Sequence, residues 1–223
     1  MLRKIQIFIE QKDFVMSKRA CDEAIAAGAD SSGKVYAYRG ASHLGLNQYA
    51  LAERDCEVAH KLDPTLTMAI FWLALAKRGT GDWKGVVLYA SKVLKSHPCH
   101  VTSWSLRCEA KRQLGMWRSV VADTSTVLKF DRKNGAVWCA RAEALMHLGK
   151  LSDAETSATN GIKYASDLPM LYQIRGESRY QQKKFKLSID DFHNFTKLDR
   201  VRRNAPFTAH AYAIWKRNRD RPW

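Results

Sequence analysis

The chain has 223 residues and a formal net charge of +15; 46% of its residues are hydrophobic and 26% are charged. Apolar and aromatic residues run along the whole length, which excludes a disordered chain, and the scarcity of glycine and proline favours helices over a β-sandwich or barrel. The positive charge favours an acidic partner, such as nucleic acid, an anionic surface or an acidic protein face, and says nothing about the fold.

Neither a membrane span nor a disulfide framework is expected. The longest uninterrupted apolar run, Met68–Ala76, is too short to cross a bilayer. The first ten residues lack the apolar centre and cleavage site of a signal peptide. Five cysteines without paired spacing favour an intracellular, reducing compartment. We expect the cytoplasm first, with the nucleus or an organelle as alternatives.

The first 32 residues are predicted to form a partial, atypical helical hairpin. Phe14, Ser17, Cys21 and Ala24 match the second half of the repeat that follows them, one residue out of phase. We therefore interpret residues 1–32 as a separate N-terminal segment of the same helical type.

Residues 33–200 carry an internal repeat of 34 residues. Trp83 and Trp117 lie 34 residues apart, and so do Gly81, Gly115 and Gly149 in series. A period of this length is typical of stacked helical hairpins. The five units begin at Gly33, Thr67, Val101, Gly135 and Pro169.

Each unit is predicted to be a helix, a short turn and a second helix. Small residues recur in the first half of the unit, where two helix backbones can approach closely. The first helix is expected to end at residues that tolerate a left-handed backbone. Pro64 and Pro98 are predicted to begin a new helix after a stop. The small residues are Gly40, Ala74, Cys108, Ala142 and Gly176, and the turn residues are Asn47, Gly81, Gly115 and Gly149.

This pattern resembles the tetratricopeptide-repeat (TPR) family over about five and a half repeats. Leu62-Asp63-Pro64 matches the end of the family's repeat, whereas Arg132, Ser166 and Arg200 replace its terminal proline. The resemblance implies an all-α fold, namely an α-solenoid: a right-handed superhelix of antiparallel helical hairpins.

Residues 201–223 are predicted to form a capping helix and a basic tail. A helix starting at Pro206 would cover the open apolar face of the last hairpin. Arginine beside tryptophan also suits contact with phosphates and stacking on bases. The basic residues of this region are Arg200, Arg202, Arg203, Lys216, Arg217, Arg219 and Arg221.

Arginine and aspartate recur sixteen residues apart within the units. A hairpin that turns midway between them would place them opposite each other, so we predict Arg–Asp pairs at 39/55, 107/123 and 175/191. In the unit that starts at Gly135, Arg141 is followed by Ser157 instead of an aspartate. We interpret the pairs as structural contacts that fix the hairpin register.

The resemblance implies that the first helices line a concave groove in which partners bind. The fifth, ninth and twelfth positions of each unit would face it. This groove is apolar and basic near residues 70–80 and acidic beyond them, so it would suit a peptide with a basic or amide-rich stretch. Alternatively, each glutamate pairs with a cation next to it on its own helix. The predicted groove residues are Phe71, Leu75, Arg78, Glu109, Arg112, Glu143 and Glu177.

No catalytic motif, cofactor or metal is predicted. A glycine-rich phosphate loop is missing from the sequence, and no acid–base pair stands out from the helical pattern. The sequence His97-Pro98-Cys99-His100 is interpreted as a surface turn between units, because a tight proline turn is a poor wrap for one zinc ion.

The sequence therefore predicts a non-catalytic scaffold or adaptor that binds a protein or peptide in the groove. One alternative is an RNA-associated subunit of a ribonucleoprotein assembly that uses the basic tail. Another is the TPR part of a co-chaperone without the cationic clamp for acidic tails, since Ala37, Ala41, Trp72, Thr102 and Leu106 occupy the clamp positions. Oligomeric state is left open.

Overall fold

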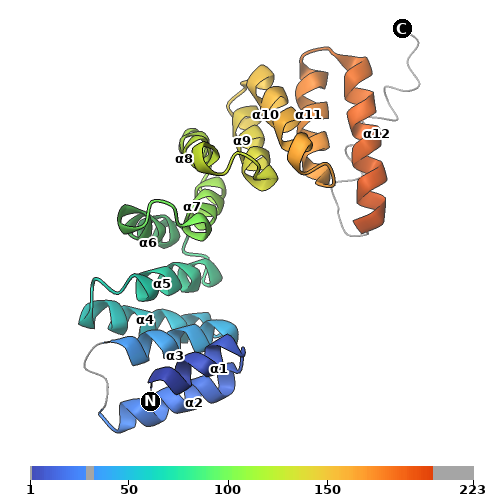
Figure 1. The fold of residues 1–223 in the computed structure, drawn as a ribbon. Coiled ribbons are helices and arrows are strands. Elements are labelled where there is room, and N and C mark those ends of the chain that lie inside the picture. The colour runs from blue at the N-terminus through green and yellow to red at the C-terminus, as the bar shows by residue number, and fades with distance from the viewer. Residues whose placement is uncertain (1, 29–32, 203–223) are drawn as a thin grey trace. The chain divides into compact units, whose positions relative to one another are not determined.

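The computed structural model describes residues 2–28 and 33–202, and within these ranges all regular secondary structure is α-helical (Figure 1). The helices are α1 (Leu2–Glu10), α2 (Phe14–Ala26), α3 (Lys34–Gly45), α4 (Tyr49–Leu62), α5 (Thr67–Gly79), α6 (Trp83–Ser96), α7 (Val101–Gln113), α8 (Trp117–Phe130), α9 (Gly135–His147), α10 (Leu151–Tyr164), α11 (Pro169–Gln181) and α12 (Phe185–Arg202).

The 34-residue period of the sequence reappears as a period of helix starts. From α5 onward, first helices begin at Thr67, Val101, Gly135 and Pro169. The second helices α6, α8, α10 and α12 begin sixteen residues after those starts. The predicted all-α architecture of antiparallel helical hairpins is thereby confirmed. The predicted capping helix after Pro206 lies outside the described residues.

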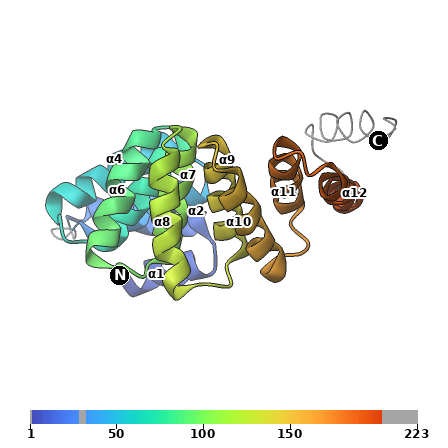
Figure 2. The same cartoon turned by 90° about the horizontal axis from the view of Figure 1, so that it is seen from above.

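Helices α1–α7 belong to one compact unit, residues 1–114, and α8–α12 to a second, residues 115–223. In the first unit each helix packs against the next, from α1 to α7. In the second, α8 packs on α9, α9 on α10, α10 on α11 and α11 on α12; Figure 2 shows α9 beside α10 and α11 beside α12. This division differs from the division by repeats at residues 32 and 200, which stays an interpretation.

All four residues predicted to end a first helix have a positive φ angle, and a further residue that was not predicted shares it. Asn47 and Gly149 have positive φ angles of 58° and 71°, as expected for the end of a first helix. Lys183, which occupies the same place in the last hairpin, also has a positive φ, 62°. The backbone therefore imposes the left-handed geometry even where the residue disfavours it.

The prediction that Pro64 and Pro98 begin helices is wrong. Both lie in turns between hairpins, and α5 begins three residues after Pro64, at Thr67. The carboxylate of Asp63 accepts hydrogen bonds from the backbone N–H and the hydroxyl of Thr65, at 2.9 and 2.7 Å. The turn is thus held by a side-chain cap around the proline.

Small residues form the contacts between the helices of a hairpin. Ala52, Ala74, Ala142 and Ala154 are all completely buried. A Cβ atom added to Gly40 would lie 2.5 Å from the Sγ of Cys56, closer than packing allows. The close approach of helices predicted from these positions is therefore present, and it leaves little tolerance for larger side chains.

Two of the predicted Arg–Asp pairs are present and are bidentate. Arg39 donates from Nε and Nη2 to the two carboxylate oxygens of Asp55, each at 2.7 Å. Arg175 donates to Asp191 from Nε at 3.0 and 3.1 Å and from Nη2 at 2.6 Å. Both pairs join the first and second helices of one hairpin. Arg107 lies in the compact unit of residues 1–114 and Asp123 in that of residues 115–223, so the pair at 107/123 stays a prediction.

Three arginines at this position of the repeat also donate hydrogen bonds to the preceding hairpin, which the sequence analysis did not predict. Arg107 donates from Nη1 to the hydroxyl of Ser91 at 3.0 Å, and Arg175 donates from Nη1 to Thr159 at 3.4 Å. Arg141 donates from Nη1 to Ser125. All three acceptors lie sixteen residues before their arginine. The hydroxyl recurs at this position in three repeats, so the sequence held a signal that could have predicted these hydrogen bonds.

Acidic residues of second helices form further links to the hairpin that follows. Lys77 contacts Glu53 at 2.7 Å in the first unit, and Arg179 contacts Glu155 at 2.8 Å in the second. Each pair spans 24 residues. Although burial alone would raise the pKa of Glu155, the hydrogen bonds from Lys184 and Arg179 hold it below its ordinary value. These partly buried links connect successive repeats.

Candidate functional site

First helices form a continuous layer in the first unit. The backbone of α1 approaches α3, α3 approaches α5, and α5 approaches α7, although a second helix separates each pair in the sequence. In the second unit α9 approaches α11 in the same way. The residues predicted to face the groove lie on this layer, five of them in the first unit and two in the second.

Apolar groove residues on α5 are only partly covered. Phe71 and Leu75 are half-buried and pack against a core that includes Ala74 and Val86. The ring of Phe71 also meets the ring of His100 edge-on, with 5.0 Å between the centroids. His100 in turn caps α7, because its Nδ1 accepts a hydrogen bond from the backbone N–H of Ser103 at 3.2 Å. The turn before α7 therefore helps to position Phe71.

The charged groove residues of the first unit include an ion pair between first helices. Arg78 on α5 lies 3.6 Å from Glu109 on α7, and their side chains are 48% and 41% exposed. Glu109 therefore meets a cation from the preceding hairpin, which neither of the two sequence-based interpretations had foreseen. At this exposure the pair contributes at most about 1 kcal/mol, so a ligand can compete for either partner. Arg112, one turn along α7, is half-buried.

In the second unit the predicted acidic positions are Glu143 on α9 and Glu177 on α11. Both side chains are half-buried, and the two helices approach each other directly. The structure thus places two carboxylates on neighbouring first helices. Their proposed role in binding a peptide stays a prediction.

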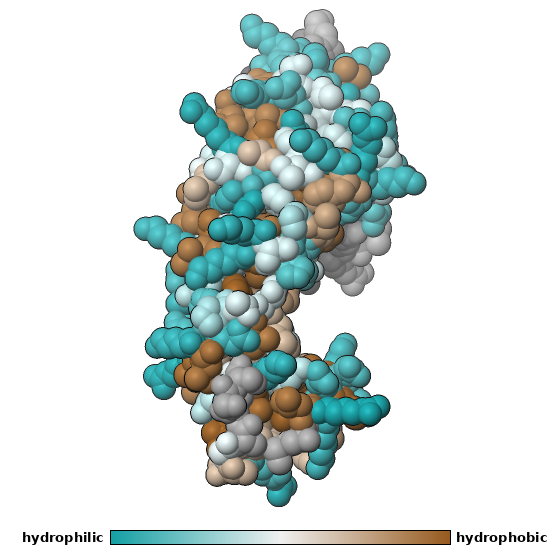
Figure 3. All heavy atoms as spheres, turned by 60° about the vertical axis from the view of Figure 1, so that its left-hand side comes forward, coloured by the Kyte–Doolittle hydropathy of each residue, from teal (hydrophilic) through white to brown (hydrophobic). Residues whose placement is uncertain are grey.

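The surface offers mixed chemistry. Figure 3 shows small hydrophobic patches that lie between hydrophilic side chains on the face that it displays. Leu88 on α6 is the kind of apolar side chain that contributes to such patches, with 53% of its surface exposed.

Most of the predicted basic tail lies outside the described residues. Arg200 and Arg202 belong to the last turns of α12, and Arg203, Lys216, Arg217, Arg219 and Arg221 fall in residues 203–223, which the structure does not describe. RNA binding by the tail therefore remains a hypothesis from the sequence.

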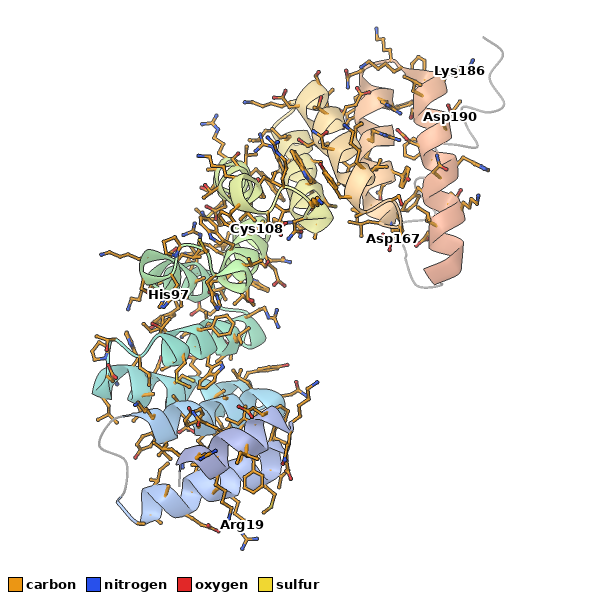
Figure 4. All side chains as sticks on the ribbon, viewed as in Figure 1. Arg19, His97, Cys108, Asp167, Lys186 and Asp190 are labelled. Carbon is orange, nitrogen blue, oxygen red and sulfur yellow. The ribbon has the colours of Figure 1, made fainter. Side chains whose placement is uncertain are left out.

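The turn from His97 to His100 joins α6 to α7, as the sequence indicated; His97 is labelled in Figure 4. Within residues 2–28 and 33–202, no group of three histidine, cysteine or acidic side chains is arranged to hold a metal ion. Cys99, in this turn, is an exposed thiol. Among the described helices, none combines the length and apolar character that a bilayer crossing requires.

Several solved structures have the same arrangement of helical hairpins. The chain is similar to the C-terminal part of a TPR repeat-containing protein from Cytophaga hutchinsonii, with a TM-score of 0.76, 10% identity, and coverage of 96% of this chain and 94% of that one. The chain has the TPR fold. Residues 41 to the end of MamA from Desulfovibrio magneticus RS-1 give a TM-score of 0.72 at 14% identity, covering 78% of this chain and 99% of the other.

A third similar structure is YrrB, described as a TPR protein with an unusual peptide-binding site. Its TM-score is 0.73 at 11% identity, with coverage of 87% of this chain and 98% of that one. Neither a protein-family model nor a curated protein sequence matches the chain. At these identities the similarity establishes the fold alone, and the function has to be argued from the residues.

Proposed function

We propose that this TPR chain is a non-catalytic scaffold or adaptor that holds a segment of a partner protein on its first-helix layer. The observation that carries the proposal is the surface of α5 and α7, where half-buried apolar side chains adjoin an exposed ion pair. Phe71 and Leu75 offer apolar contact, and Arg78 and Glu109 offer charges of both signs. This combination of apolar anchors and a polar rim is typical of protein-binding surfaces.

In the second unit, Glu143 and Glu177 favour a basic or amide-rich peptide. A peptide lysine or arginine beside these half-buried carboxylates would form charge-assisted hydrogen bonds, which are stronger than neutral ones. A segment that binds beside Glu143 and Glu177 would therefore carry cationic side chains, and a segment that binds on α5 and α7 would carry an apolar anchor. The fold supports this proposal in general terms, since the similar protein YrrB is described as binding peptide.

The proposal can be tested with fluorescently labelled peptides that differ only in charge, measured by fluorescence polarisation. Peptides with lysine or arginine should bind more tightly than matched acidic ones. Glu177→Lys should weaken binding about tenfold, corresponding to about 1.4 kcal/mol. The control Asp190→Lys makes the same charge change at an exposed position of α12 and should leave binding unchanged.

The apolar anchor has its own matched pair of variants. Phe71→Ala should weaken binding, whereas Leu88→Ala removes an exposed apolar side chain from α6 and should have no effect. If both groove variants bind like their controls, the first-helix layer is not the binding surface. Capture from cell extract that disappears with nuclease and ignores both groove variants would instead indicate RNA association through the basic tail.

A further inference from the structure

The hairpin of α9 and α10 lacks the aspartate that binds the arginine in the hairpins of Arg39 and Arg175. Arg141 takes the position of Arg39 and Arg175, but Ser157 takes the position of Asp55 and Asp191. Ser157 is buried, so the position that an aspartate takes in those hairpins lies inside this one and not at its surface. The arginine is thus retained without its usual counter-ion.

Arg141 is held from one side only. Its Nη1 donates to the hydroxyl of Ser125 and, at 3.2 Å, to the backbone carbonyl of Val121, both on α8. In Arg39 and Arg175 the edge formed by Nε and Nη2 binds an aspartate. In Arg141 that edge has no hydrogen-bond acceptor among the residues that the structure describes.

The electrostatics of the arginines differ accordingly. Hydrogen bonding to Asp55 raises the pKa of Arg39 despite its burial. Burial lowers the pKa of the Arg141 guanidinium, and the carboxylate of Asp153 opposes this only in part. Arginine nevertheless stays protonated in proteins, so Arg141 is a half-buried cation that would gain from a bound anion.

An open cavity of about 870 Å³ adjoins this arginine. Residues of α8, α9 and α10 line it. In the second unit α8 packs against α9, and α9 packs against α10 (Figures 1 and 2). Arg141 and Ser157 both contribute to the lining. The side of the hairpin without an aspartate is therefore accessible to a ligand. Lys129 and Ser157 of the lining lie on second helices, whereas Arg141 lies on α9, the first helix that also carries Glu143.

Around the cavity the charges favour a dianion. Lys129, Arg132 and Arg141 supply three positive charges, and Asp153 is the one acidic residue of the lining. A phosphate monoester carries a charge of about −2 at pH 7, which balances this set, whereas a single carboxylate does not. The indole of Trp138 donates from Nε1 to the carbonyl of Arg132 at 2.9 Å and so fixes the segment that bears this cation.

We propose that this cavity is an oxyanion site for a phosphate monoester, bound bidentately by the Nε–Nη2 edge of Arg141, the edge that binds an aspartate in Arg39 and Arg175. Arginine is well suited to this role because its planar fork matches two phosphate oxygens. Lys129 and Arg132 would attract the anion, and the hydroxyls near Arg141 would accept or donate further hydrogen bonds. Whether the phosphate belongs to a modified side chain or to a small metabolite, the chemistry of recognition is the same.

The test uses NMR of arginine Nε–H groups during titration with inorganic phosphate, with phosphoserine and phenyl phosphate as organic probes. The Arg141 signal should shift in a saturable way, with half-saturation below about 20 mM, while the signals of Arg39 and Arg175 stay unchanged. A stronger response to phosphoserine would favour a modified protein as the source, and a stronger response to phenyl phosphate a small aromatic ester. Acetate should produce no comparable shift, and an equal response to acetate would overturn the assignment to phosphate.

Two variants complete the test. Ser157→Asp restores the internal pair, so it should abolish the phosphate response without lowering the urea midpoint of unfolding. Lys129→Ala combined with Arg132→Ala changes two exposed side chains and should weaken binding about three- to tenfold without a folding defect. A phosphate response that is missing from the unmodified protein, or one that Ser157→Asp leaves at full strength, would refute the site.

Discussion

The Arg175–Asp191 pair allows the clearest quantitative prediction about stability. The Asp191 side chain is only 1% exposed and accepts hydrogen bonds from Arg175 at 2.6 Å and from Arg179 at 2.8 Å. These arginine side chains are themselves 14% and 15% exposed. Asp191→Ala would leave two buried guanidinium groups without this carboxylate, and we expect it to lower the free energy of unfolding by about 3–5 kcal/mol.

The remaining contacts set the expected difference between the two arginines. Arg179 keeps its bond to the carboxylate of Glu155, whereas Arg175 keeps a hydrogen bond to the hydroxyl of Thr159 and its position over the ring of Tyr172, neither of which supplies a negative charge. The uncompensated charge therefore lies mainly on Arg175. Arg175→Ala in the Asp191→Ala background should cost less than it does in the unmodified protein, with a coupling energy of about 1–3 kcal/mol.

Urea denaturation followed by far-UV circular dichroism measures these free energies. The control is Asp190→Ala, which removes the preceding, exposed carboxylate of α12 (Figure 4) and should change stability by less than about 0.5 kcal/mol. Additive effects of the two substitutions, within about 0.5 kcal/mol, would refute the inferred pairing.

Three further results are expected. Lys183→Gly should stabilise the protein by about 1 kcal/mol in urea denaturation, because glycine adopts the left-handed backbone without strain; Lys183→Ala keeps the strain and should show no such gain. Because bonding to cations lowers the pKa of Glu155 in the folded state, its contribution to stability is present above its unfolded pKa of about 4.5 and is lost on acidification through the folded value. Glu155→Gln should therefore reduce the steepness of acid unfolding below about pH 5, and an unchanged acid profile would contradict this. In native protein a thiol reagent should modify the exposed Cys99 rapidly and Cys56, whose pKa burial raises, only after unfolding; equal rates would show that Cys56 is accessible.

Much of the fold could be predicted from the sequence because each repeat shows the same pattern of residues for the same local geometry. The 34-residue period located the helix starts, and the glycine positions located the turns. The pairs at 39/55 and 175/191 followed from a hairpin that turns midway between arginine and aspartate. All of these features depend on contacts inside one hairpin, whose geometry a short turn determines.

Contacts between hairpins were decided by the tertiary structure. The offset at which one hairpin stacks on the next is set by side-chain packing, and a period along the chain does not specify it. For this reason the link between Arg78 and Glu109 was missed. The bonds from Arg107 and Arg175 to the preceding hairpin had a signal in the recurring hydroxyl, but the sequence did not show that the two positions meet. Lys183 was missed because its backbone is fixed by the helices around it and not by its own preference.

The inference about Arg141 needed both the repeat pattern of the sequence and the tertiary structure. The sequence alone showed that Ser157 stands where other hairpins have aspartate, which marks the unit as different. Only the tertiary structure showed that the guanidinium keeps its bonds to α8, that the opposite edge has no acceptor among the described residues, and that a cavity adjoins it. A missing partner is visible in a repeat pattern, but whether solvent and ligand can reach the vacancy depends on how three helices pack around it.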